Sequence, residues 1–206
     1  MKCVIIALKV GEKIYFTCKN WNEERNMLLS YHECLEKYGT DYQIKKSLQE
    51  GRLFMTEKGL YSEERYVPEL EIIMKKYPNA IMTLNSAFYY YDLTDTIPDY
   101  YYVATPKSNR KIEDTRVKQI YENSDAFEMG KTTIEYDGVN ITIYNKERLL
   151  IELIRNKRKF SFELYKEIIG NYRKLIHKMD MTQIAEYAYE LPKTNMVMET
   201  IRLEIL

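Results

Sequence analysis

Residues 40–58 of the 206-residue chain contain several polar and cationic side chains of the types that contact nucleic acid. They are Thr40, Tyr42, Gln43, Lys45, Lys46, Gln49, Arg52 and Lys58. If Ile44 and Leu48 turn inward on a helix, Tyr42, Gln43 and Lys46 face outward together with Gln49. Such a face can enter a DNA major groove, where glutamine reads adenine edges and lysine reads guanine or holds a phosphate. Arg52 and Lys58 then suit neighbouring phosphates.

A second concentration of positive charge lies in the C-terminal half. It comprises Arg148, Arg155, Lys157, Arg158 and Lys159. A basic cluster of this kind is able to contact nucleic acid. It is equally typical of a solvated helix end, because cations are favoured at helix C-termini. We therefore predict a basic surface here and leave both interpretations open.

The sequence contains few residues that support catalysis or metal binding. Phosphate-binding, dinucleotide-binding and hydrolase motifs are missing, and His32 and His177 give no plausible pair with a nucleophile. Three widely spaced cysteines (Cys3, Cys18 and Cys34) fit reduced thiols better than a disulfide framework. We expect no enzyme, no cofactor and no metal site. The 20 tyrosines indicate packed core more than a surface that stacks on bases.

Two capping patterns define the elements that position the first group of residues. Ser30 is followed three residues later by Glu33, and Thr40 by Gln43, so each pair predicts a helix start. Gly39 and Gly51 are suited to end the two helices. Residues 52–56 and 60–62 then predict two strands joined by a turn at 57–59. With a short first helix at 22–29, this order of elements is that of a winged helix-turn-helix.

The remaining segments predict a mixed α/β domain with a helical C-terminal tail. We expect a helix at 79–91, strands at 100–104, 117–121, 132–136 and 139–144, and helices at 146–156, 161–175, 181–189 and 194–203. The predicted fold class is α+β. The predicted domains are an N-terminal extension over 1–27 containing a β-hairpin, the winged helix over 28–66, and the second domain over 67–206.

Composition limits the class of protein. Lys and Arg number 31 and Asp and Glu also number 31, so the whole chain has no basic character and charge must be judged by region. No apolar stretch reaches the length needed to span a bilayer, and the short run at the start lacks the features of a signal peptide. We expect a cytoplasmic protein.

Six segments together carry a family resemblance: 38–46 (YGTDYQIKK), 50–53 (EGRL), 57–62 (EKGLYS), 84–95 (LNSAFYYYDLTD), 143–155 (IYNKERLLIELIR) and 184–188 (IAEYA). They resemble the AbiEi family, the antitoxin-regulators of type IV toxin–antitoxin (abortive infection) systems. The resemblance covers residues 28–206.

This resemblance implies a repressor that binds its own promoter through the winged helix. It also implies an antitoxin that counters a nucleotidyltransferase-like toxin without forming a stable complex with it, the C-terminal domain being required. The residue pattern leaves two other interpretations open: a winged-helix module that binds a protein and no DNA, and a nuclease-like enzyme.

Overall fold

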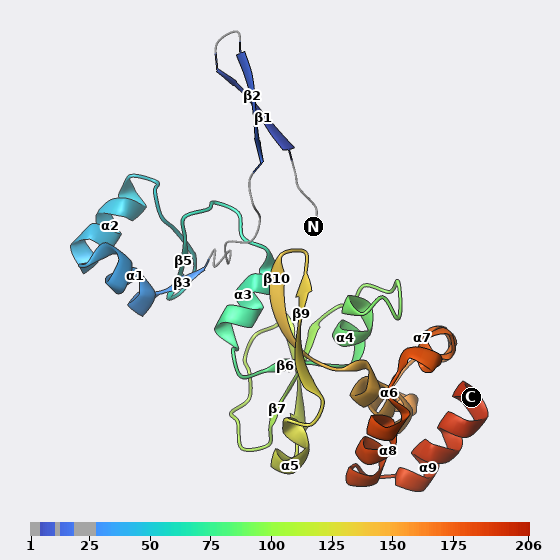
Figure 1. The fold of residues 1–206 in the computed structure, drawn as a ribbon. Coiled ribbons are helices and arrows are strands. Elements are labelled where there is room, and N and C mark those ends of the chain that lie inside the picture. The colour runs from blue at the N-terminus through green and yellow to red at the C-terminus, as the bar shows by residue number, and fades with distance from the viewer. Residues whose placement is uncertain (1–4, 11–12, 19–27) are drawn as a thin grey trace. The chain divides into compact units, whose positions relative to one another are not determined.

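A computed structural model describes residues 5–10, 13–18 and 28–206. The chain divides into two compact units, residues 1–72 and 73–206. In the described residues the fold is mixed α/β (Figure 1). The boundary between the units lies inside helix α3 (Glu69–Lys76), a helix that the sequence analysis did not predict. Domain limits at 66 and 67 had been expected.

The first unit begins with strands β1 (Ile5–Val10) and β2 (Lys13–Cys18). They pair antiparallel, with Ile5 opposite Cys18. The hairpin was predicted in this segment, although its turn at 11–12 lies outside the described residues. Most of the short helix expected at 22–29 also lies outside them, and Leu29 belongs to a strand.

Two short helices and a three-stranded sheet make up the rest of this unit. Helices α1 (Tyr31–Tyr38) and α2 (Asp41–Gln49) lie between β3 (Leu29–Ser30) and β4 (Phe54–Glu57), and β5 (Leu60–Ser62) follows. The sheet order is β3-β5-β4, antiparallel throughout. The core of these elements is formed by Cys34, Ile44 and Leu53, which are almost completely buried.

Local side-chain contacts explain why the two helices start where they do. The Ser30 hydroxyl accepts from the backbone N–H of Glu33, and the Glu33 carboxylate accepts from the N–H of Ser30 at 2.6 Å. The Thr40 hydroxyl accepts from the N–H of Gln43 at 3.3 Å. Gly39 separates the helices with a φ of +83°, a conformation that costs glycine little because it has no Cβ. The predicted helix starts are thus confirmed.

The second unit is built on a five-stranded mixed sheet. Its strands are β6 (Ile81–Met82), β7 (Tyr101–Pro106), β8 (Val117–Glu122), β9 (Lys131–Tyr136) and β10 (Val139–Tyr144). Their order is β8-β7-β6-β10-β9, with β6 parallel to β10, β7 parallel to β8, and the other pairs antiparallel. The last four strands lie close to their predicted positions.

The single helix expected at 79–91 is wrong in its first part. Ile81 and Met82 form the central strand β6, and α4 (Leu84–Tyr90) begins only afterwards. Ile81 pairs with Ala104 on β7, while Met82 faces Ile143 on β10. Both side chains are completely buried, so sheet pairing between segments distant in sequence outweighs the helical pattern here.

Helices gather beside the sheet at the C-terminal end of the chain (Figure 1). They are α6 (Lys146–Arg155), the 3-10 turn η1 (Lys157–Lys159), α7 (Phe162–Leu175), the 3-10 turn η2 (Ile176–Lys178), α8 (Met181–Glu190), α9 (Thr194–Thr200) and the π-helical segment η3 (Ile201–Ile205). The short helix α5 (Ser124–Phe127) comes earlier in the chain, between β8 and β9. Helix α6 packs against α4, α8 and α9. Residues 148–154 of α6 are all buried, which makes this helix the centre of the unit.

Candidate nucleic-acid interface

Helix α2 presents a polar face to solvent. Tyr42 has 71% of its surface exposed, and Gln43, Lys46 and Gln49 are exposed beside it. On the opposite side Ile44 is buried, as predicted, Ser47 is also buried and Leu48 is half-buried. The 3.6-residue period of the helix therefore separates one apolar stripe from one polar stripe.

The N-terminus of α2 is held by two side chains. Thr40 is exposed, but its hydroxyl already accepts the N–H of Gln43. Asp41 accepts hydrogen bonds from the Tyr31 hydroxyl at 3.2 Å and forms an ion pair with Lys45 at 2.6 Å. The hydrogen bond from Lys45 lowers the pKa of the Asp41 carboxyl, and the same bond raises the pKa of the Lys45 ammonium. Lys45 is thus oriented along the helix.

The C-terminal end of α2 carries a second cluster of charges. Glu50 forms an ion pair with Lys46 at 3.8 Å and accepts a hydrogen bond from Arg52. Lys46 and Arg52 keep about half or more of their side-chain surface exposed. Because surface ion pairs are weak and exchange readily, these cations remain available to a phosphate.

The hairpin of β4 and β5 carries another cation in its turn, and the Gly59 carbonyl of this turn accepts the N–H of Tyr31 at the start of α1 at 3.2 Å. Gly59 has a φ of +82° and lies in the turn, with exposed Lys58 directly before it. Among residues 28–206, Lys58 has no carboxylate within ion-pair distance. The Thr56 hydroxyl donates to the carbonyl of Leu60 at 3.1 Å and closes the turn. Lys58 is therefore an uncompensated charge at the hairpin tip.

Two exposed side chains in this region were missed by the sequence analysis. Met55 on β4 is 61% exposed, and Tyr31 at the start of α1 is 41% exposed. The register of β4 and β5 shifts between Met55 and Glu57, and no local pattern in the sequence predicts that irregularity.

The second predicted group of cations is only partly a surface. Lys157, Arg158 and Lys159 form the turn η1 and are exposed. Lys157 pairs with Glu204 at 2.7 Å and its ammonium lies 4.4 Å from the centre of the Tyr165 ring. Arg158 and Lys159 thus form the open part of this basic turn.

Arg148 and Arg155 do not belong to that surface, and the prediction for them is wrong. Arg148 has no exposed side-chain surface and Arg155 only 16%. Both contact Glu152, at 2.8 Å and 2.7 Å, because spacings of four and three residues place all three on one side of α6. Glu122, at the end of β8, lies 3.5 Å from Arg148. The charges compensate one another inside the unit.

The surroundings of these charged side chains shift the pKa of one of them, Glu122. Burial, followed by the nearby Glu152 carboxylate, raises the pKa of Glu122. Asn156 donates to Glu152 at 3.0 Å, so this carboxylate has three partners. We call these residues, Glu122, Arg148, Glu152, Arg155 and Asn156, the buried charge network.

The described part of the chain contains neither a metal-ligating cluster nor a membrane-spanning helix. Within it, no group of three or more His, Cys, Asp or Glu side chains is arranged to hold a metal ion. No helix in these ranges combines the length and apolar character needed to cross a bilayer.

Comparison with known proteins finds solved structures of similar fold but no family. No family model and no curated protein matches the chain. Among solved structures, the RV2827C protein of Mycobacterium tuberculosis is similar, with a TM-score of 0.59 and 12% sequence identity. The similarity covers 87% of this chain and 72% of that one. At this identity the likeness concerns the fold alone.

Proposed function

We propose that the chain is a cytoplasmic DNA-binding transcriptional repressor with antitoxin activity, of the type IV toxin–antitoxin (abortive infection) kind. Residues 28–66 act as a winged helix-turn-helix, with α2 as the recognition helix and the β4–β5 hairpin as the wing. The protein represses its own operon and counters a nucleotidyltransferase-like toxin without a stable complex. The resemblance of six sequence segments to the AbiEi family supports this assignment.

The observation that carries the proposal is the exposed polar face of α2. Tyr42, Gln43, Lys46 and Gln49 are exposed there, opposite the buried Ile44. Helix α2 is amphipathic and directly follows the short helix α1, which is the arrangement of a helix-turn-helix. A helix with such a polar face fits the width of a major groove. The wing cation Lys58 suits an adjacent phosphate.

The two kinds of side chain have different roles in this interface. Gln43 and Gln49 read base edges, because an amide pairs in a bidentate way with adenine. Lys46 and Lys58 neutralise phosphates and fix the position of the protein on the duplex. Lys45 and Arg52 exchange their present carboxylate partners for phosphates on binding.

A fluorescence anisotropy titration tests the DNA-binding part of the proposal. The full-length chain is titrated against duplex DNA from immediately upstream of its own gene and against a scrambled duplex, at several salt concentrations. The variant Lys46→Glu with Lys58→Glu should lose about tenfold or more in affinity, and its log–log salt slope should fall by roughly two units.

A matched control separates local contacts from overall charge. Lys111 and Lys178 are exposed lysines of the second unit, so Lys111→Glu with Lys178→Glu makes the same change in net charge. This control should bind the upstream duplex almost as well as the unchanged chain. Equal losses in both double variants, or no binding to either duplex by the unchanged chain, would refute the interface. A stable protein partner in its place would favour the protein-binding module.

The proposal predicts a nucleotidyltransferase gene beside this one, and the antitoxin part is tested in cells that express the product of that gene. Co-expression of the chain should restore growth, and Arg158→Glu with Lys159→Glu should weaken the rescue without affecting DNA binding. Rescue that persists undiminished in this variant would remove the basic turn from the mechanism.

A further inference from the structure

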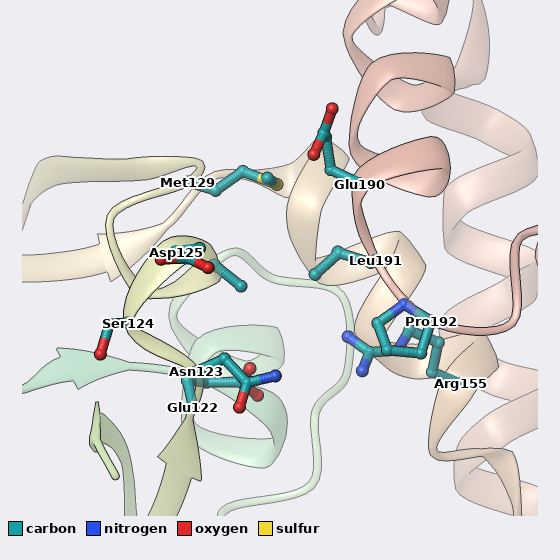
Figure 2. A pocket seen from close by; sticks show the side chains of 10 residues that line it. Glu122, Asn123, Ser124, Asp125, Met129, Arg155, Glu190, Leu191 and Pro192 are labelled. Atoms are coloured by element: carbon teal, nitrogen blue, oxygen red, sulfur yellow. The ribbon is translucent and has the colours of Figure 1, made fainter. Parts of the chain in front are cut away.

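A polar pocket lies in the second unit, and none of the proposed DNA-interface residues lines it. Its volume is 440 Å³, within the range of about 300–1,000 Å³ that small-molecule sites occupy. The turn from β8 into α5 forms one wall, and the turn between α8 and α9 forms the other (Figure 2). Arg155, from the end of α6, lies between the two walls. Nothing in the proposed repressor function uses this pocket.

The pocket contains hydrogen-bond donors suited to an anionic group. Arg155 uses its Nη1 for Glu152, while its buried Nε has no acceptor among the described residues. Figure 2 shows the Arg155 guanidinium and the side-chain amide of Asn123 pointing toward one another across the pocket. A buried N–H without an acceptor is costly, and the Nε–Nη2 edge of an arginine matches a carboxylate. These two side chains therefore suit a carboxylate ligand.

Carboxylates surround the donors. Glu122 lines the pocket, lies 3.5 Å from Arg148 and is mostly buried. Asp125 and Glu190 line the pocket from opposite walls and are exposed. Arg155 is thus outnumbered by three acidic side chains in the lining. A dianionic phosphate would meet strong repulsion here, whereas a cationic group is attracted.

The apolar part of the lining separates the two kinds of polar group. Met129 and Leu191 line the pocket together with Ala126, so a ligand with a methylene chain between its charged ends would bury that chain. Leu191 and Ala126 are buried and fixed by the core of the unit. The arrangement consists of a donor pair, an apolar middle and acidic side chains.

We propose that this pocket binds a basic amino acid. The α-carboxylate of the ligand contacts Arg155 and Asn123, and its ammonium or guanidinium groups pair with Asp125 and Glu190. A polyamine lacks the acceptor that Arg155 needs, and a dicarboxylate lacks the cation that the acidic side chains need. The ligand therefore requires both charges at once.

Isothermal titration calorimetry on the full chain tests this site with defined probes. L-lysine and L-arginine are compared with their decarboxylated analogues, cadaverine and agmatine, and with glutarate, which has no cation. At least one of the two amino acids should bind saturably, and removal of its carboxylate should weaken binding about tenfold or more. Glutarate should give no measurable binding.

Two variants and one control connect the binding to this pocket. Asn123→Ala, and separately Asp125→Asn with Glu190→Gln, should each reduce the affinity for the amino acid. Within the described residues these three side chains form no hydrogen bond or ion pair whose loss would unfold the unit. Glu186→Gln, one turn earlier on α8 and exposed, should bind normally. Circular dichroism verifies that all variants are folded.

The possible outcomes are decisive in either direction. Saturable binding that depends on the carboxylate and is lost in the pocket variants supports the site. Failure of both amino acids to bind overturns it, as does equal binding of cadaverine or agmatine. Binding that survives in all pocket variants places the ligand elsewhere and also overturns it. The result is independent of whether the chain binds DNA.

Discussion

Substitution of Gly130 by alanine should strongly destabilise the second unit. Gly130 has a φ of +74°, and a Cβ built on it would lie 2.7 Å from the Cβ of Arg148 and 2.9 Å from the Oδ1 of Asn145. The Arg148 Cβ cannot swing away, because it is attached to the backbone of the buried helix α6. The Asn145 oxygen is also constrained, because it caps α6 by accepting the N–H of Arg148 at 2.9 Å.

The size of the effect follows from three contributions. The left-handed conformation costs an alanine roughly 1 kcal/mol, overpacking against α6 costs about 1–3 kcal/mol, and disturbance of the Asn145 cap costs about 1 kcal/mol. Together they lower the free energy of unfolding by about 4 kcal/mol. At roughly 2–4 °C for each kcal/mol in a chain of this size, Tm should fall by about 8–16 °C.

A second glycine provides a control of opposite sign. Gly170 lies inside helix α7, and a Cβ there would meet nothing within 4 Å. Gly170→Ala should raise the free energy of unfolding by about 0.5–1 kcal/mol, because alanine loses less conformational freedom than glycine in a helix. Urea denaturation followed by circular dichroism measures the free energy of unfolding of both variants. If the free energy of unfolding of Gly130→Ala lies within about 1 kcal/mol of that of the unchanged chain, residue 130 is not packed as tightly against α6 as described above.

Three further variants test how the charged side chains contribute to stability and to binding. Glu152→Gln should lower the free energy of unfolding by about 3 kcal/mol, because two buried guanidinium groups lose their shared carboxylate; a loss below about 1 kcal/mol in urea denaturation would contradict this. Hydrogen bonds from Arg116 lower the pKa of the Asp114 carboxyl, so Asp114→Asn should cost about 2 kcal/mol at neutral pH. Because the folded-state pKa is lowered, this difference is complete above the unfolded pKa of about 4 and is lost as pH falls below it, which urea titrations at several pH values would measure. Asp41→Asn with Glu50→Gln should strengthen binding to a scrambled duplex severalfold in anisotropy titrations and so reduce specificity, since both carboxylates now engage cations of α2; unchanged affinity would argue against those cations as phosphate contacts.

Features that depend on neighbouring residues were predicted well. Ser30 with Glu33 and Thr40 with Gln43 define the helix starts that the structure has. The predicted strands at 132–136 and 139–144 are joined by Asp137 and Gly138, and both residues have positive φ, 52° and 80°, as a tight hairpin turn requires. In each case the interacting groups lie within a few residues, so the sequence pattern contains the whole interaction.

Features that depend on distant residues were not predicted. Ile81 and Met82 look helical by local pattern but form the central strand, because β7 and β10 supply their partners. The pocket likewise combines residues 122–126 with 190–192, which no spacing in the sequence connects.

The polar face of α2 was determined by the sequence alone, since helical periodicity opposite Ile44 dictates which side chains turn outward. The fate of Arg148 was decided only by the tertiary structure. An arginine in a basic stretch is expected at the surface, and the sequence analysis placed Arg148 there. Its own helix also offers Glu152 as a partner one turn away. Whether that pair faces water or the core depends on which elements cover α6, and burial is a property of the assembled unit and not of the local chain.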